Sequence, residues 1–399
     1  MNPGTEEFPE WVKIPTQMQY QFFELAEKQA KNIKTKLLKD KENLSTLSKL
    51  MRFEKIPENE EWKNWRIAVV DGSDSPVLSE RIGGRFGTYG ATYHIFQGLD
   101  LVEEEYFSGD FSGFQLGDPE TSMKMLSLLT AKLERETALL CLKKNVDLII
   151  IDGSLFGFRP RCRIIHNQTV PNDEFKNGVE LVKHTRDISI KLLESKKVVG
   201  IIKRVQTSAI DGWTICKRGN ASLQLNRNDK QILSSLIKEG EWFSYETVFE
   251  DPIIFNYYTR LALAYQRYAA DRKRSIESIF RACRGEVDRN IRRDLLCEPE
   301  LILRTARHYI RCTYPAPPFC FETPIDFKTT PILAFFKASC NKATGLPILL
   351  DLTDQDITIP AGFTREFVEE IEARLTKDPD LDKYEIENHF GSLNPQKQE

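Results

Sequence analysis

The feature that most constrains the fold of this chain is a short apolar run that ends in an aspartate. Residues 146–155 read V-D-L-I-I-I-D-G-S-L, and the β-branched residues and leucines follow one another without polar alternation. Such a run is typical of a strand buried on both faces, in the centre of a sheet that helices cover. Asp-Gly then turns the chain at the C-terminal end of the strand, where α/β sheets bind their ligands. The sequence therefore predicts that Asp152 lies at the ligand-binding edge of a sheet.

The same motif, an apolar run followed by Asp-Gly-Ser, occurs once earlier in the chain. Residues 65–75 read W-R-I-A-V-V-D-G-S-D-S, with Asp71 in the position that corresponds to Asp152. A single Asp-Gly after a strand is most often only a turn. Two of them on strands of one sheet favour a pair of carboxylates that meet at one edge.

The order of the expected elements predicts an α/β fold with an RNase H-like core, a mixed sheet with helices on both faces. The elements are expected, in chain order, at residues 67–71, 83–98, 101–107, 119–143, 146–152, 173–194 and 198–205. They read as strand, hairpin, strand, helix, strand, helix and strand. In that topology the first strand and the strand after the first helix lie side by side.

The composition is that of an ordinary soluble globular protein, with an apolar share of 41% and a charged share of 29%. Because the net charge is only −3, any nucleic-acid surface must be local. No N-terminal segment has the order of a signal peptide, and no apolar run approaches the about 20 residues that span a bilayer. We therefore expect a cytoplasmic protein without membrane contact.

Residue spacing argues against two common kinds of site. The eight cysteines include no C-x-x-C pair, which argues against a zinc site and a disulfide framework. The glycine-rich segment 83–98 is not followed by Lys-Ser or Lys-Thr and opens no helix, so it is not expected to bind ATP as a phosphate loop.

A glutamate from the helix expected at 119–143 would add a third carboxylate to Asp71 and Asp152. Glu134 is favoured because it lies beside small residues, where the helix can approach the strand ends. Glu136 remains the alternative ligand. Like charges in one cleft raise one another's pKa unless a cation neutralises them, and oxygen ligands suit Mn²⁺ or Mg²⁺. Two such ions can activate a water and stabilise the leaving oxygen of a phosphodiester.

Basic residues follow this core. Lys203 ends a buried strand and is expected either to reach a phosphate or to extend its ammonium group into solvent. Residues 256–311 are expected to be helical, and they carry 13 Lys and Arg against 7 Asp and Glu, with tyrosines interleaved. Such a stretch suits a DNA groove, although a solvated basic face has the same composition. The candidate DNA-binding residues are Lys203, Arg204, Arg267, Arg272, Lys273 and Arg274.

A long helix is expected before the core, over residues 16–51. Its apolar stripe consists of Phe22, Ala26, Ala30, Ile33 and Leu37. A stripe at this spacing needs a partner. It is expected either to pack on its own domain or to form a dimer contact.

With these features the sequence resembles the NurA family of nucleases, partners of the HerA translocase in DNA-end processing. The resemblance lies in V-V-D-G-S at Asp71, the glutamate-bearing helix, I-I-D-G-S-L at Asp152, V-G-I-I-K-R at Lys203 and the later G-L-P-I-L-L. It implies an RNase H-like fold and Mn²⁺-dependent cleavage of DNA, including 5′-to-3′ digestion with possible endonuclease activity. It also implies a homodimer that docks on a hexameric HerA-type ATPase during double-strand-break end resection. The expected catalytic residues are Asp71, Glu134, Asp152 and Lys203.

One departure from the family concerns the C-terminal part of the site. Members often carry Ala-His a few residues after their Gly-x-Pro, and the matching place here is Thr353-Asp354. Asp354 is therefore expected either to replace that histidine as a metal ligand or to mark a site that works differently. His308, His389 and Tyr309 are not secure substitutes, and both histidines are expected at the surface.

These expectations divide the chain at residue 60. Residues 1–60 form a lead-in and helix, and residues 61–399 form the nuclease domain. The latter comprises the core at about 65–205, an insertion at 206–250, the basic helical region at 251–311 and a completion of the core at 312–399. Two alternatives are a non-catalytic DNA-binding adaptor of a translocase and an actin-like phosphotransferase. The former would not need the carboxylates, and the latter would need a second, duplicated core.

Overall fold

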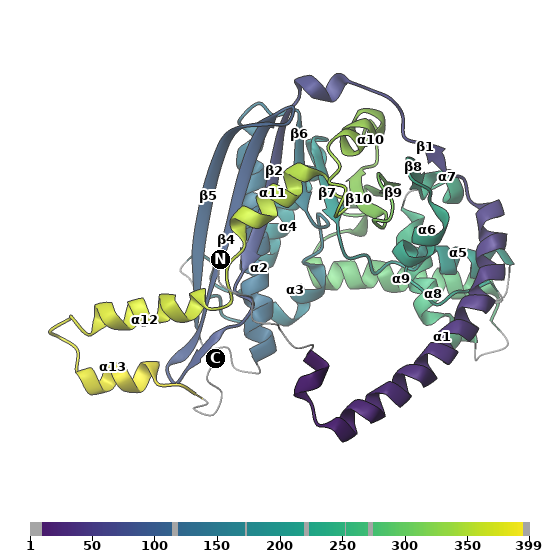
Figure 1. Ribbon diagram of the computed structural model, residues 1–399. Helices are drawn as coiled ribbons and strands as arrows, with labels where there is room; N and C mark the ends of the chain where they lie inside the picture. The colour runs from purple at the N-terminus through teal and green to yellow at the C-terminus, as the bar shows by residue number, and fades with distance from the viewer. Residues whose placement is uncertain are drawn as a thin grey trace, which may run out of the picture.

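The computed structural model describes residues 10–113, 119–171, 174–218, 223–251, 253–269 and 274–393. One mixed sheet runs through them in the order β1-β8-β9-β10-β7-β6-β2-β4-β3, and β5 pairs with the other edge of β4 (Figure 1). The strands are β1 (Glu54–Lys55), β2 (Arg66–Asp74), β3 (Ser79–Arg81), β4 (Gly84–Gln97), β5 (Asp100–Gly113), β6 (Leu148–Asp152), β7 (Val198–Ile202), β8 (Glu241–Ser244), β9 (Thr305–Arg311) and β10 (Phe319–Pro324). The helices are α1 (Thr16–Leu50), α2 (Pro119–Leu142), α3 (Arg159–Ile165), α4 (Gly178–Glu194), α5 (Ala209–Arg218), α6 (Asp229–Leu236), α7 (Glu246–Phe249), α8 (Ile254–Ala269), α9 (Ile276–Leu295), α10 (Thr329–Ala338), α11 (Ile348–Ile357), α12 (Phe363–Leu375) and α13 (Lys383–Phe390).

The centre of the sheet consists of the parallel strands β2, β6 and β7. Val70 of β2 lies beside Ile151 of β6, so the two Asp-Gly motifs that follow lie at the same edge of the sheet. Alternate residues face opposite sides of the sheet. Val69 and Ile150 pack with α10 and α11, whereas Val70 and Ile151 pack with α2 and α4. The predicted α/β core, with helices on both faces of a mixed sheet, is confirmed.

A separate hydrophobic core lies beyond β7. Helices α5, α6, α8 and α9 pack there around the buried rings of Tyr245 and Tyr309. The hydroxyl groups of these tyrosines lie 3.1 Å apart, and that of Tyr245 donates a hydrogen bond to the buried Asp229. Residues 206–250 and the helices that follow them therefore share one core.

The expectation that the chain is helical from residue 256 to 311 is wrong at its C-terminal end. Helix α9 ends at Leu295, and Thr305–Arg311 forms strand β9 between β8 and β10. Ala306, Tyr309 and Ile310 are fully buried in this strand. Burial in the sheet thus decides the local structure, whereas the basic composition pointed to a helix.

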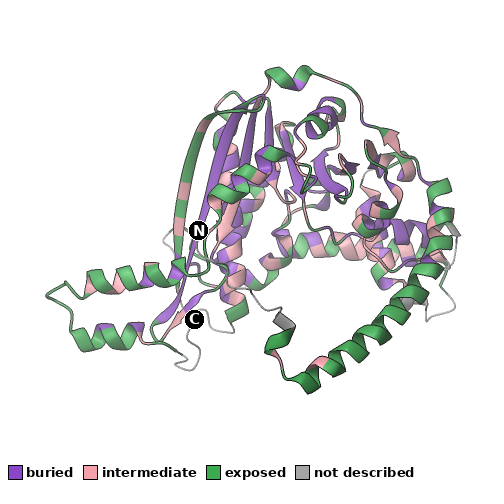
Figure 2. Ribbon diagram, in the orientation of Figure 1, coloured by how far each residue is buried: buried purple, intermediate pink, exposed green. Residues whose placement is uncertain are grey.

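The apolar stripe of α1 is not covered by any part of the chain that the structure describes. Phe22, Ile33 and Leu37 are each more than half exposed, and the buried residues of α1 are Asp40 and Leu47, near its C-terminal end. Figure 2 shows most of the helix as exposed ribbon that projects from the body of the molecule. The expectation that the stripe packs on its own domain is therefore wrong, and the dimer contact stays a prediction.

Helices α12 and α13 form a hairpin that projects from the opposite side (Figure 1). Val368, Ile386 and Phe390 attach it to Phe86 of β4. None of the helices that the structure describes combines the length and apolar character of a membrane span.

Candidate active site

The predicted aspartates meet at one edge of the sheet. Asp71 ends the core-buried part of β2, Asp152 ends β6, and Asp354 reaches the same point from α11. One carboxylate oxygen from each of these residues lies within 4.8 Å of one oxygen from each of the other two. The parallel pairing of β2 with β6 explains the first two positions, and α11, packed on the sheet, supplies the third.

Lys203 joins this cluster from the end of β7. Its Nζ lies 2.8 Å from Asp152 Oδ2 and 3.2 Å from Asp354 Oδ1. Burial alone would lower the pKa of Lys203, but the charges of Asp152 and Asp354 outweigh it and raise that pKa. The ammonium group is therefore held in its charged form between two carboxylates.

Asp71 is the most buried of the clustered aspartates, with 4% of its surface exposed. Its Oδ1 accepts a hydrogen bond from Gly72 N at 2.8 Å, whereas its buried Oδ2 has no hydrogen-bond partner among the described residues. Burial, followed by the charges of Asp152 and Glu134, raises the pKa of Asp71 well above its usual range, and Lys203 opposes this rise. A buried, unpaired carboxylate oxygen is costly, and a bound cation would remove that cost. The donor set therefore fits a divalent metal ion.

Glu134 approaches the cluster from α2. A Cβ atom placed on Gly72 would lie 3.2 Å from Thr130 Cγ2 and 3.4 Å from Glu134 Cβ, so a glycine here lets the helix come close to the end of β2. Burial raises the pKa of Glu134 to about 7; the Arg135 guanidinium opposes the rise, and the Asp152 charge adds to it. Glu134 Oε1 lies 2.8 Å from Arg135 Nη1 but lacks the alignment of a hydrogen bond.

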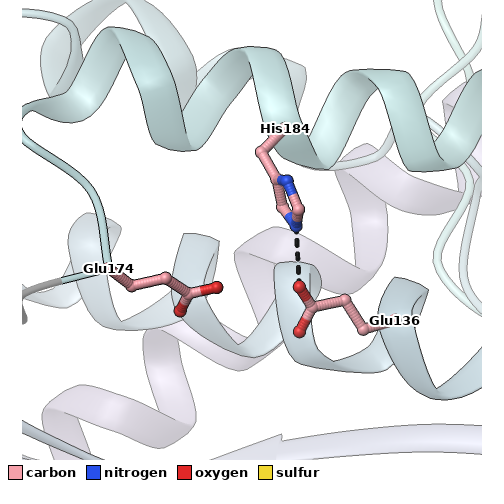
Figure 3. A group of neighbouring side chains, drawn as sticks. All are labelled: Glu136, Glu174 and His184. Atoms are coloured by element: carbon pink, nitrogen blue, oxygen red, sulfur yellow. Dashed lines mark hydrogen bonds and ion pairs between the residues drawn. The ribbon is translucent and has the colours of Figure 1, made fainter.

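Glu136, the alternative ligand, lies in a different cluster (Figure 3). Its Oε1 lies 2.7 Å from His184 Nε2, and its Oε2 lies 3.0 Å from the ammonium group of Lys132. That ammonium group is also 2.6 Å from Glu174 Oε2. Two residues along a helix correspond to a rotation of about 200°, so Glu134 and Glu136 point in opposite directions. The structure does not bring Glu136 to Asp71 and Asp152, and both Glu136 and Glu174 are paired with Lys132.

The serines of the two Asp-Gly-Ser motifs form hydrogen bonds that hold neighbouring elements of the site in place. Ser73 Oγ accepts a hydrogen bond from Ile359 N at 3.1 Å, which ties the chain after α11 to β2. Ser154 donates to the carboxylate of Glu322 on β10, which also accepts from Leu155 N at 3.2 Å. Sequence reasoning missed Glu322. The signal was a lone glutamate in the apolar run F-C-F-E-T-P, a buried charge that needs partners.

A cleft of about 1020 Å³ opens beside Asp152, Lys203 and Asp354. It extends between the turn after β6, α3, α8 and α9. Its wall is basic, and the arginines that line it are Arg159, Arg161, Arg204, Arg260 and Arg307. Arg260 is paired with Glu286 and Arg307 with Glu322.

Of the predicted DNA-binding residues, Lys203 and Arg204 line this cleft. Arg267 and Arg274 are exposed and do not line it, and Arg272 and Lys273 lie outside the described residues. Tyr257, Tyr258 and Tyr309 of the basic stretch are buried, so their rings are not available to stack on the bases of DNA in a groove.

The histidines near the C-terminus are not part of the carboxylate cluster. The expected surface position is wrong for His308, which is 2% exposed in β9 with Nε2 3.1 Å from Thr323 Oγ1. Burial lowers the pKa of His308 to about 3, so it is neutral. His389 packs edge-on against Phe86 in the α12–α13 hairpin. The residue from this part of the chain that reaches the cluster is Asp354.

A family model described as the NurA domain matches residues 13–282 of this chain. The chain belongs to the NurA family. The matched segment includes Asp71, Glu134, Asp152 and Lys203, and Asp354 lies beyond it. The resemblance found in the sequence is thereby confirmed. No curated protein sequence matches the chain.

Solved structures of the NurA family are similar to this chain in fold. The NurA nuclease from Sulfolobus solfataricus has a TM-score of 0.57 at 14% sequence identity, with 92% of this chain and 100% of that chain covered. A NurA structure with manganese has a TM-score of 0.48 at 15% identity, covering 88% and 99% of the two chains. Endonuclease V from Ciona intestinalis, in complex with DNA, has a TM-score of 0.33 at 11% identity, covering 87% and 99%. At these identities the similarity to the Sulfolobus protein shows a shared fold. The TM-scores of the other two structures are too low to support a conclusion about this chain.

Proposed function

We propose that this chain is a divalent-metal-dependent deoxyribonuclease that hydrolyses phosphodiester bonds in DNA. The observation that carries the proposal is the cluster of Asp71, Asp152 and Asp354, in which one carboxylate oxygen from each residue lies within 4.8 Å of the others. Carboxylates at that separation repel one another unless a cation neutralises them. An all-oxygen donor set suits Mn²⁺ or Mg²⁺. Membership of the NurA family supports DNA as the substrate.

Asp71, Asp152 and Asp354 would hold the metal, as one or two ions, with Glu134 as a further ligand. A divalent ion at this point supplies a water of lowered pKa and charge stabilisation for the leaving oxygen. Glu134, with its pKa raised by burial to about 7, can hold or release a proton near neutral pH.

Lys203 has a second role in this proposal. Its ammonium group is paired with Asp152 and Asp354. With the charge of these carboxylates balanced by a bound cation, the ammonium group would be available to donate to a phosphate oxygen of the substrate.

The test of the proposed function is hydrolysis of a short duplex with and without Mn²⁺, on molecules labelled at the 5′ or the 3′ end. We expect cleavage that needs the metal and stops with a chelator, and early release of a 5′ label, since we propose 5′-to-3′ digestion with some endonuclease activity. Cleavage that persists after chelation would overturn the metal-dependent mechanism, and early release of the 3′ label would overturn only the polarity.

We further propose that the chain is a homodimer that works with a HerA-type hexameric ATPase in the resection of double-strand breaks. Family membership and the exposed apolar stripe of α1 support this assignment. Digestion of a long duplex should become ATP-dependent and faster when the cognate ATPase is added. Failure of the two proteins to co-purify, with ATP leaving digestion unchanged, would identify a self-sufficient nuclease.

The alternative of a non-catalytic DNA-binding adaptor is less well supported. Such a protein has no need to bring the carboxylates of Asp71, Asp152 and Asp354 together, because their repulsion lowers stability. The buried Asp71 oxygen without a hydrogen-bond partner favours the enzyme.

A further inference from the structure

Two arginines of the short helix α3 stand out among the charged residues of the cleft. Arg159 and Arg161 both line it and both are partly buried. Neither guanidinium group forms a hydrogen bond or an ion pair with any described residue, whereas Arg260 and Arg307 of the same cleft are paired with glutamates. Among the described residues, these two guanidinium groups therefore have no anion within hydrogen-bond or ion-pair distance.

The surroundings of Arg159 make this costly. Burial lowers its pKa; the carboxylate of Asp294 opposes the effect, and the neighbouring charges of Arg307 and Arg293 add to it. A partly buried cation among like charges lowers stability unless an anion compensates it. An arrangement of this kind is typical of a site whose anion comes from a ligand.

Arg161 lies on the side of the cleft that adjoins the carboxylates. Burial raises the pKa of both Asp74 and Glu134, and the positive charge of Arg161 opposes this rise. Arg161 forms no ion pair with either carboxylate. The cleft itself begins at Asp152 and Asp354. Arg159 and Arg161 thus line the same cleft that opens at the proposed metal site.

We propose that Arg159 and Arg161 form a phosphate-binding subsite, which holds backbone phosphates of the DNA strand next to the phosphate under attack. Arginine suits this role because its planar fork donates two parallel hydrogen bonds to phosphate oxygens. Contacts of this kind fix the register of a strand without reading its sequence. The subsite rests on the proposed nuclease function and sets how the strand lies relative to the carboxylates.

The helix offers a matched control. Arg163 is on α3, two residues beyond Arg161, but it is exposed and does not line the cleft. Arg159→Gln, Arg161→Gln and Arg163→Gln each remove one positive charge from the same short helix. Because the first two guanidinium groups have no hydrogen-bond or ion-pair partner among the described residues, their loss is not expected to unfold the protein, and thermal unfolding of each variant checks this.

The experiment measures binding of a fluorescein-labelled single-stranded 20-mer to the full-length protein by anisotropy, in EDTA so that no cleavage occurs, across a salt series. We expect Arg159→Gln and Arg161→Gln each to weaken binding about 10-fold and to reduce the slope of log affinity against log salt by about 0.7. Arg163→Gln should change neither quantity by a comparable amount. Arg159→Lys and Arg161→Lys should restore the salt slope but only part of the affinity.

Cleavage assays in Mn²⁺ on the same variants separate this proposal from the proposed function. If the parent protein cleaves DNA and the Arg159 and Arg161 variants bind like Arg163→Gln, the subsite is wrong and the nuclease assignment stands. If the parent cleaves no DNA but these variants still lose binding and salt dependence, the subsite stands and the nuclease assignment is wrong.

Discussion

Ser154 donates its hydroxyl hydrogen to the carboxylate of Glu322, and its Oγ lies 3.1 Å from each of the two carboxylate oxygens. The same carboxylate accepts hydrogen bonds from Leu155 N at 3.2 Å and from Arg307 Nε at 3.0 Å. Strand β10 thereby holds the turn that follows Asp152. The carboxylate is buried, so these hydrogen bonds offset the cost of removing it from water.

The first prediction concerns this contact. Ser154→Ala should lower the free energy of unfolding by about 1.5–3 kcal/mol, because it removes a hydrogen bond to a charged, buried acceptor. Urea unfolding of the metal-free protein measures the change. Ser48→Ala is the control, since Ser48 is exposed on α1 and donates only to Ser45 O. Equal effects of the two substitutions would contradict the role given to Ser154.

The second prediction compares aspartates at the two ends of one strand. Asp152 is at the C-terminal edge of β6, whereas Asp147 precedes the strand and accepts a hydrogen bond from Arg66 N at 2.8 Å. Asp152→Asn and Asp71→Asn should reduce metal-dependent cleavage on the order of 100-fold or more. Asp147→Asn should leave it nearly unchanged.

The same variants should differ in stability without metal. Asp71→Asn replaces a buried carboxylate that is repelled by its neighbours with a neutral side chain of the same shape, so the melting temperature in EDTA should rise. Near-normal cleavage by folded Asp71→Asn or Asp152→Asn would remove these residues from the active site. An unchanged melting temperature of Asp71→Asn would contradict the repulsion.

The third prediction is a pH dependence. The pKa of Glu134 is raised by burial from its usual 4.5 to about 7, so between these values the folded protein binds more protons than the unfolded chain. Stability of the metal-free protein should therefore fall as the pH rises from about 4.5 to about 7. Glu134→Gln should flatten this part of the curve. Chemical unfolding at a series of pH values in EDTA measures both, and a curve for Glu134→Gln that matches the parent would argue against a buried, protonatable Glu134.

The sequence alone predicted the centre of this fold because the information there is local. Unbroken apolar runs predict strands that are buried on both faces. The repeated Asp-Gly motif at the ends of two such strands predicted that Asp71 and Asp152 lie at one edge of the sheet. Small residues beside Glu134 favoured it over Glu136, and α2 approaches the strand end on that side.

What the sequence did not predict depends on contacts between distant segments. Glu322 meets Ser154 only because β10 lies beside β7, a pairing between segments far apart in the chain. The burial of Tyr309 was not predicted for the same reason. Tyr309 belongs to strand β9, which is buried because β8 and β10 pair with it from distant parts of the chain. Arg159 lines the cleft because α3 lies near α9, which no local pattern indicates.

The fourth prediction addresses the departure at Asp354. Lys203 and the other aspartates surround its carboxylate, so Asp354→Ala should lower cleavage and weaken metal binding. Asp354→His introduces the residue that family resemblance expects at this place, and it should retain more activity than the alanine variant, since an imidazole is also a Mn²⁺ ligand. Cleavage rates and Mn²⁺ titration calorimetry measure the two effects. Gln355→Ala, the exposed neighbour on α11, is the control. Equal activity of Asp354→Ala and the parent protein would exclude Asp354 from the site.

The fifth prediction concerns the exposed stripe of α1, which we propose as the dimer contact. Ile33 and Leu37 are 55% and 54% exposed on one face of a long helix whose attachment to the body lies near its C-terminal end. A glutamate in the middle of an apolar contact must lose its hydration, so Ile33→Glu and Leu37→Glu should each shift the proposed dimer toward the monomer. Thr35→Glu adds the same charge on the opposite face of the helix and should leave the assembly unchanged. Sedimentation velocity at micromolar concentration distinguishes the species. A parent protein that sediments as a monomer would exclude the stable dimer, and a dimer unaffected by Ile33→Glu and Leu37→Glu would move the contact away from α1.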